Sequence, residues 1–237
     1  MTAVLDFHSH ILPRVDDGSQ SVEESVALLR MLSEQGVDLV AATPHFYADH
    51  STPERFLEKR EAAYGRLQEG LRADPSLSAP DIRLGAEVWY YPGVSRTKGI
   101  EALRLEGTKL LLLEMPMETW GQYTVREILD LNASGALTVV LAHIERYLPL
   151  QSPDVWDLLL QNDVLFQVNA SFFLSHRSRR KAMKLLRRGQ IHWIGSDCHN
   201  LSSRPPRIGQ AASLIREKLG DAFLADFDAQ NRSYLGT

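Results

Sequence analysis

Cysteine is nearly absent from this chain of 237 residues, which contains Cys198 and no other. A single cysteine excludes an internal disulfide and fits a reducing compartment. Long apolar runs are also missing, because no stretch approaches the roughly 18 residues that a membrane span needs. The N-terminus opens on a predicted strand and shows no basic or apolar region of the kind found in secretion signals. We therefore expect a cytoplasmic protein without membrane insertion.

The chain likewise lacks an excess of basic residues. Its formal net charge is −4 and its pI is about 6.1, which argues against general nucleic-acid binding. The local exception is the segment RSRRKAMKLLRR, residues 177–188, which we interpret as the solvated face of an amphipathic helix. No linker rich in Gly, Pro or Ser interrupts the sequence, so we predict a single domain over residues 1–237.

Short apolar runs alternate along the chain with segments of helical period, which is typical of parallel strands joined by crossover helices. Ser21 with Glu24 forms a capping box, and Thr52 followed by Pro53 marks a second helix start. The predicted strands cover residues 3–7, 38–42, 82–87, 109–114, 137–142, 164–168 and 191–195. The predicted helices cover residues 21–36, 52–72, 123–133, 152–160, 175–188, 208–219 and 221–228.

Histidines and carboxylates recur where these strands end. His8 and His10 follow the first strand, and the period of two places both imidazoles on the same side. Six of the seven strands deliver such a residue. The candidate ligands are His8, His10, the pair Asp16 and Asp17, His45, Glu87, Glu114, His143, Asp197 and His199. Reactive residues at the carboxyl ends of many strands favour a distorted α/β barrel over an open doubly wound sheet, which would gather them near one switch point.

These residue types indicate a metal cluster. A carboxylate such as Glu114, which completes the run Leu110-Leu111-Leu112-Leu113, needs a partner to offset its desolvation. The candidates are too numerous for one ion, and mixed histidine and carboxylate ligands suit Mn, Fe or Zn better than Ca or Mg. We therefore expect two or three divalent ions, which would activate water and clamp the oxygens of a phosphoryl group, as in hydrolytic enzymes.

Two arginines complete the predicted site. Arg146 follows His143 by three residues, and Arg204 follows His199 by five. A guanidinium binds phosphate through two parallel hydrogen bonds and stays charged, so the pair is suited to hold the substrate's nonbridging oxygens.

The motifs in chain order resemble those of the PHP (polymerase and histidinol phosphatase) superfamily, and most closely its bacterial protein-tyrosine phosphatase branch of capsule and exopolysaccharide synthesis. The matching stretches are DFHSHILP at 6–13 with DDG at 16–18, ATPH at 42–45, GAE at 85–87, LEMP at 113–116, AHIERY at 142–147 and SDCHN at 196–200. The resemblance implies a distorted (β/α)7 barrel of the TIM type with a trinuclear metal site, for which we expect manganese, with iron or zinc as alternatives.

By that resemblance, His8, His10, Glu87 and Asp197 surround one ion, and Glu87, Glu114 and His143 surround a second. Asp17, His45 and His199 hold the third, Asp17 being chosen because the family's ligand directly precedes the glycine. Arg146 and Arg204 match the phosphate-binding arginines of the branch. The implied reaction is attack of metal-bound hydroxide on phosphotyrosine, and the implied substrates are the tyrosine-rich tails of membrane-associated bacterial tyrosine kinases.

Other functions share part of this pattern. A histidinol-phosphate type of metabolite phosphatase would use the same metal site, and so would a non-catalytic metal-binding subunit or, less readily, a 3′ to 5′ exonuclease. In addition, the segment from Cys198 to Arg204 satisfies C-x5-R, the motif of cysteine-dependent tyrosine phosphatases, although no glycine separates the two residues.

Substrate preference depends on two loops at the same rim, residues 46–52 and 115–123. Four of their aromatic residues could contact a phosphotyrosine ring, or could equally be ordinary loop packing: Phe46, Tyr47, Trp120 and Tyr123.

Overall fold

The computed structural model describes residues 4–236, so Ala3 of the first predicted strand lies outside the described residues. Within that range the strands are β1 (Val4–Ser9), β2 (Val37–Ala42), β3 (His45–Phe46), β4 (Asp81–Leu84), β5 (Glu87–Trp89), β6 (Leu110–Glu114), β7 (Thr138–Leu141), β8 (Leu165–Asn169) and β9 (Trp193–Gly195). The α-helices are α1 (Val22–Glu34), α2 (Pro53–Ala73), α3 (Gln122–Ala133), α4 (Pro153–Gln161), α5 (Ala170–Leu174), α6 (Arg179–Arg187), α7 (Ile208–Leu219) and α8 (Asp221–Leu235). Three short 3-10 helices are η1 (Val94–Arg96), η2 (Ile100–Leu103) and η3 (Ile144–Arg146).

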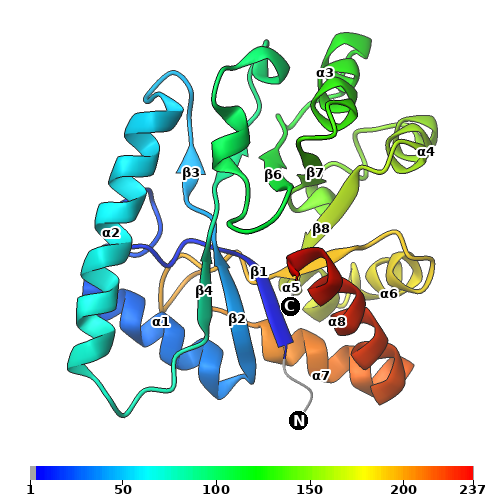
Figure 1. The fold of residues 1–237 in the computed structure, drawn as a ribbon. Helices are drawn as coiled ribbons and strands as arrows, with labels where there is room; N and C mark the ends of the chain where they lie inside the picture. The colour runs from blue at the N-terminus through cyan, green and yellow to red at the C-terminus, as the bar shows by residue number, and fades with distance from the viewer. Residues whose placement is uncertain (1–3, 237) are drawn as a thin grey trace.

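All strand pairs between these elements are parallel, and they form two curled sheets with the orders β1-β2-β4 and β3-β5-β6-β7-β8-β9. A bridge between Ser9 and Cys198 joins β1 to the chain beyond β9. Helices lie around the outside, with α1 and α2 on the side of β2 and β4, and α3, α4 and α6 on the opposite side (Figure 1). The predicted distorted α/β barrel is therefore confirmed.

The predicted strand 82–87 is divided into β4 and β5, which belong to different sheets. The backbone bends at Gly85, whose N–H donates to Ala42 O, while Glu87 N–H donates to Pro44 O. Pro44 has no N–H of its own, so the ladder cannot continue unbroken from β2 to β3. The bend is what places Glu87 at the start of β5 rather than at the end of a longer strand.

Two helix boundaries also differ from the sequence prediction by more than two residues. The helix predicted at 221–228 continues to Leu235 as α8. Residues 175–178 form turns, and the predicted helix 175–188 begins only at Arg179, after the short helix α5. Ser178 Oγ donates to Phe172 O, which ties this turn back to α5. The buried residues of α6 are Ala182, Met183 and Leu186, and its Lys and Arg side chains lie outside that set. The basic segment is thus an amphipathic helix, as interpreted from its sequence.

Strand residues alternate between two buried clusters. Leu111 and Leu113 of β6 belong to the large cluster that includes helix residues, whereas Leu110 and Leu112 belong to a smaller one formed mainly by strands. Both faces of the sheet are covered, which explains the unbroken apolar run. Within residues 4–236, no helix has the length and apolar character needed to cross a lipid bilayer.

Candidate metal centre

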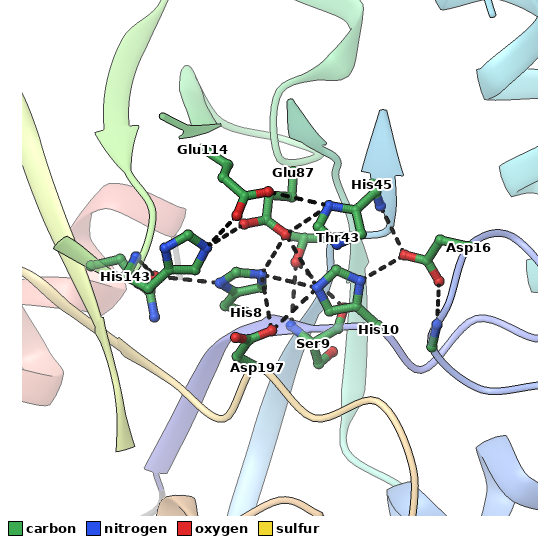
Figure 2. Close-up of polar contacts among 12 residues, drawn as sticks. His8, Ser9, His10, Asp16, Thr43, His45, Glu87, Glu114, His143 and Asp197 are labelled. Atoms are coloured by element: carbon green, nitrogen blue, oxygen red, sulfur yellow. Dashed lines mark hydrogen bonds and ion pairs between the residues drawn. The ribbon is translucent and has the colours of Figure 1, made fainter. Parts of the chain in front are cut away.

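The predicted ligands occupy strand ends and the loops that follow them, and ion-pair distances connect all nine into one cluster. Most of the cluster appears in Figure 2. His8 is in β1 with His10 just beyond it, His45 opens β3, Glu87 opens β5, Glu114 ends β6, His143 follows β7, Asp197 and His199 follow β9, and Asp17 is in the loop after β1. Two of the nine, His45 and Asp17, are not buried.

The deepest group consists of His8, His10, Glu87 and Asp197. His8 Nε2 lies 3.0 Å from Glu87 Oε2 and 3.8 Å from Asp197 Oδ1. His10 Nε2 lies 3.3 and 3.5 Å from the same two oxygens. These four side chains converge on one point, and they are the set expected around the first ion.

A second group forms around Glu87 and Glu114. His143 Nε2 is 2.8 Å from Glu87 Oε1 and 3.3 Å from Glu114 Oε1. His45 also reaches this group, because its Nδ1 is 3.1 Å from Glu87 Oε2 and 3.6 Å from Glu114 Oε2. Glu87 thus has one oxygen toward each of the first two groups, which is the geometry of a bridging carboxylate.

A third group lies nearest to solvent. Asp17 Oδ1 is 3.6 Å from His45 Nε2 and 3.4 Å from His199 Nε2. The Asp17 side chain is 66% exposed, in contrast to the buried His199. His10 also belongs to this group, since its ligand atom lies within 4.8 Å of those of the other three. A cation held here would be the most accessible to exchange.

Hydrogen-bonding geometry indicates that these groups fit divalent cations. The Nδ1 atom of His8 donates to Gln167 Oε1, and that of His10 donates to Asp16 Oδ2. The two Nε2 atoms therefore face each other only 3.1 Å apart, with lone pairs aimed at a common point when the rings are neutral. Within residues 4–236, the buried atoms His45 Nδ1, Glu87 Oε2 and His199 Nε2 make no hydrogen bond.

The electrostatics agree with that fit. Burial opposes ionisation of Glu87, yet the nearby imidazoles of His8, His10 and His143 hold its pKa well below the usual range. Burial also disfavours charged His143, but the Glu114 and Glu87 carboxylates raise its pKa to about 9. The pocket therefore stabilises positive charge, which is what bound cations supply.

Arg146 and Arg204 both point their guanidinium groups at Asp197. Arg146 donates to Asp197 Oδ2 at 3.0 Å and to Glu114 Oε1 at 3.3 Å, and Arg204 donates to Asp197 Oδ1 at 2.7 Å. Both side chains are more than a third exposed, at 37% and 40%. They therefore lie at the edge of the cluster, where an incoming anion would meet them.

Asp16 has a role that the sequence did not reveal. Its side chain is 4% exposed and accepts hydrogen bonds from His10 Nδ1 at 2.6 Å and from the His45 backbone N–H at 2.8 Å. Burial disfavours its charge, but His10 holds its pKa well below the usual range. Asp16 thus orients two proposed ligands, and its neighbour Asp17 is the one that faces the ion site.

Strand β8 supplies no ligand, yet its two polar side chains support three of them. Gln167 Oε1 accepts from His143 N–H at 2.6 Å and from His8 Nδ1 at 3.3 Å. Gln167 Nε2 donates to Asn169 Oδ1, and Asn169 Nδ2 donates to Asp197 Oδ2. Their sequence signal was two amide residues inside an apolar strand, at alternate positions.

We expect Gln167→Leu to weaken metal binding by about ten- to a hundredfold, because His8 and His143 lose the acceptor that orients them. Calorimetric titration of Mn²⁺ into metal-free protein measures this. Gln151→Leu is a matched control, since the side-chain amide of this buried glutamine bonds Trp120 and Glu118, which are not among the proposed ligands. Equal losses of Mn²⁺ affinity in both variants would mean that Gln167 affects metal binding only through the general stability of the fold.

Two proposed ligands have unusual backbone conformations. His143 has φ of 29° and Asp197 has φ of 52°, in a region that costs non-glycine residues about 1–3 kcal/mol. Nearby, a Cβ added to Gly195 would lie 2.5 Å from His8 Cβ, so only glycine allows His8 to occupy its position. Strain and close packing therefore coincide at the ligands, as is common at functional sites.

The alternative cysteine nucleophile does not fit this geometry. Cys198 is fully buried, and burial together with the charge of Asp6 raises the pKa of its thiol to about 12. Arg204, the other end of the C-x5-R motif, donates to Asp197 instead of facing the thiol. The thiol is neither ionised nor accessible near neutral pH.

Comparison with known proteins gives consistent matches over nearly the whole chain. The profile of a family described as "Capsular polysaccharide synthesis, CpsB/CapC" matches residues 4–235. The tyrosine-protein phosphatase CpsB of Streptococcus pneumoniae is 30% identical over 233 residues, covering 92% of this chain and 91% of that protein. The CpsB of Streptococcus agalactiae is 28% identical over 228 residues, with 92% and 91% covered.

The fold also matches a solved structure. It superposes with a TM-score of 0.83 on a chain from the work described as crystal structures of YwqE from Bacillus subtilis and CpsB from Streptococcus pneumoniae, "unique metal-dependent tyrosine phosphatases". The sequences are 22% identical, and the superposition covers 98% of this chain and 94% of the other. At this identity the likeness shows a shared fold.

Proposed function

This chain belongs to the CpsB/CapC family of capsular polysaccharide synthesis, and we propose that it is a metal-dependent protein-tyrosine phosphatase. The observation that carries this proposal is the joint presence of nine converging ligands and two guanidinium groups at their edge. A purely metal-binding subunit would have no need for the two arginines. The proposed catalytic domain comprises the single unit 1–237.

We assign the ions to the three groups described above. One is held by His8, His10, Glu87 and Asp197, the second by Glu87, Glu114 and His143, and the third by Asp17, His45 and His199. The proposed complement is two to three divalent ions, with Mn favoured and Fe or Zn as alternatives, because the ligands mix imidazole with carboxylate. Such ions, when bound, activate water for attack on phosphorus and neutralise phosphoryl charge.

The side chains of the protein have separate tasks in this proposal. Arg146 and Arg204 bind the nonbridging phosphoryl oxygens, which match the planar set of donors of a guanidinium group. Asp16 and Gln167 fix the imidazoles of His10 and His8, so that each presents Nε2 to the centre. Preorganised charge and donors of this kind lower the barrier because they need not reorient during the reaction.

The proposed substrate is a phosphotyrosine protein. We propose that it is the tyrosine-rich tail of a membrane-associated bacterial tyrosine kinase that regulates capsule or exopolysaccharide synthesis, which the enzyme meets in the cytoplasm. The family membership and the net charge of −4 support this substrate over nucleic acid.

We expect the Mn²⁺-reconstituted protein to hydrolyse a phosphotyrosine peptide in preference to histidinol phosphate, and chelation to abolish turnover. Elemental analysis before and after chelation, with phosphate release measured on the same samples, tests this. Cys198→Ala should retain activity within about twofold, because the thiol lies outside the site. Activity that survives chelation but not Cys198→Ala would overturn the proposal, and preferred turnover of histidinol phosphate would favour the metabolite phosphatase.

A further inference from the structure

The four aromatic residues of the rim loops have very different environments in the folded protein. Phe46 is 1% exposed and packs on Phe56, and Trp120 is 5% exposed and packs on Tyr147 and Trp156. Both are core residues, so neither can meet a substrate. Tyr123 is 53% exposed, but its hydroxyl accepts a hydrogen bond from Arg96.

Tyr47 lies directly against the metal centre. Its ring centroid is 5.3 Å from that of His45, with 31° between the planes, and 6.2 Å from that of Trp89. A chain of contacts links Tyr47 to Arg146. The Tyr47 ring packs on the His45 ring, and the Glu114 carboxylate lies 3.6 Å from His45 Nδ1 and 3.3 Å from the Arg146 guanidinium. Trp89 of β5 pairs in register with Glu114 of β6, so the Trp89 ring that contacts Tyr47 is carried by a strand of the sheet.

A cleft of about 490 Å³ adjoins Tyr47. Asp17 and His45, two proposed ligands of the outermost ion, are among its lining residues. The rest of the lining is mixed, with the apolar side chains of Val15 and Phe56 beside polar ones such as Lys59. The cleft therefore borders the outermost proposed ion group, and one of its walls is the Tyr47 ring.

We propose that Tyr47 is a specificity-determining residue whose ring packs against the phenyl ring of an aryl phosphate and favours it over alkyl phosphates. This inference rests on the proposed phosphatase function and adds the location of its ring subsite. Aromatic rings attract each other in offset or tilted arrangements at centroid distances of about 4.5–7 Å. The tilted contacts of Tyr47 with His45 and Trp89 hold it as a fixed wall, so little entropy is lost when a second ring packs on it.

Equilibrium binding of two phosphonates separates ring recognition from catalysis. Phenylphosphonate and methylphosphonate carry the same anionic group and differ only in the ring, and neither is hydrolysed. Calorimetry with the Mn²⁺-loaded protein should show tighter binding of phenylphosphonate to the wild type. Tyr47→Ala should weaken phenylphosphonate by about tenfold and leave methylphosphonate within about twofold.

Further variants distinguish the ring from the hydroxyl and from general loop effects. Tyr47→Phe should behave as the wild type, since the ring remains, and Tyr47→Leu should lose most of the preference while keeping an apolar side chain. Tyr123→Ala removes the exposed tyrosine of the other loop and should leave the phenyl to methyl ratio unchanged. Circular dichroism and metal content confirm that each variant is folded and loaded.

Equal affinity of the wild type for both phosphonates, or parallel losses for both ligands in Tyr47→Ala, would overturn the ring subsite. Loss of the preference in Tyr47→Phe would assign the effect to the hydroxyl and would equally overturn it. The proposed function is judged separately, by whether the loaded wild type hydrolyses phosphotyrosine peptide at all.

Discussion

Glu87→Gln is expected to lower turnover of phosphotyrosine peptide by about a thousandfold and to reduce the number of bound ions. The amide has nearly the size of the carboxylate but no charge, and its nitrogen cannot coordinate a cation. Glu87 has one oxygen near His143 and the other near His8 and His45, so two of the three proposed ion positions lose a shared ligand. A thousandfold loss corresponds to about 4 kcal/mol, in the range of metal stabilisation of a charged transition state.

Elemental analysis of the purified variant, paired with its kcat, measures both effects. Glu127→Gln is the matched control, because Glu127 is an equally buried carboxylate in α3 whose partners are Tyr90, Gly93 and Ser95. That variant should keep its ions and its activity, whatever its thermal stability. Full ion content and near-normal kcat in Glu87→Gln would contradict the bridging role.

Arg146→Lys and Arg204→Lys are each expected to lower kcat/KM by about a hundredfold, with ion content unchanged. A lysine retains the charge but loses the planar pair of donors that matches phosphate oxygens. The two guanidinium groups converge on Asp197, so they lie close enough to act on one phosphoryl group. Affinity for inorganic phosphate should fall in parallel, which calorimetry can measure on the loaded protein.

Arg188→Ala is the control that tests whether loss of any positive charge, wherever it lies on the protein, lowers phosphate binding and turnover. Arg188 is exposed after α6 and precedes β9, at the opposite end of that strand from Asp197. The Arg188→Ala variant should have the kcat/KM and the phosphate affinity of the wild type. If both lysine variants bind phosphate as tightly as the wild type, the arginines serve to balance the carboxylates and do not clamp the substrate.

The amino-acid sequence determined the strands and the kind of chemistry at their ends. The apolar run within residues 109–114 indicated a strand covered on both faces of the sheet, and every residue of β6 is buried. The recurrence of histidine and carboxylate after such runs indicated the rim, since parallel strands in a barrel present their carboxyl ends together. This reasoning uses local pattern alone, and among the described residues every member of the candidate metal-binding clusters, Asp17 included, was among the predicted ligands.

Local pattern could not show how the backbone bends or which polar residue supports which ligand. The division of 82–87 into β4 and β5 depends on Gly85, between these two strands, and on Pro44, which lies between β2 and β3. Gln167 and Asn169 stood out only as amides in an apolar strand, and the sequence assigned them no role, because an amide there gains one only when His8 and Asp197 are brought beside it. His8 and Gln167 are 159 positions apart in the chain, and Asn169 and Asp197 are 28 apart, so both contacts exist only in the folded protein.

The aromatic residues at the rim show most clearly what the sequence could predict and what only tertiary packing decides. The sequence placed Phe46, Tyr47, Trp120 and Tyr123 in two loops and could not rank them, because an aromatic ring suits both a core and a binding surface. Tertiary packing buried Phe46 and Trp120, turned Tyr123 toward Arg96, and left Tyr47 beside His45. Residue types and their spacing therefore indicated the metal chemistry. Burial and side-chain orientation arise only when distant segments pack together, and they decided which ring can meet the substrate.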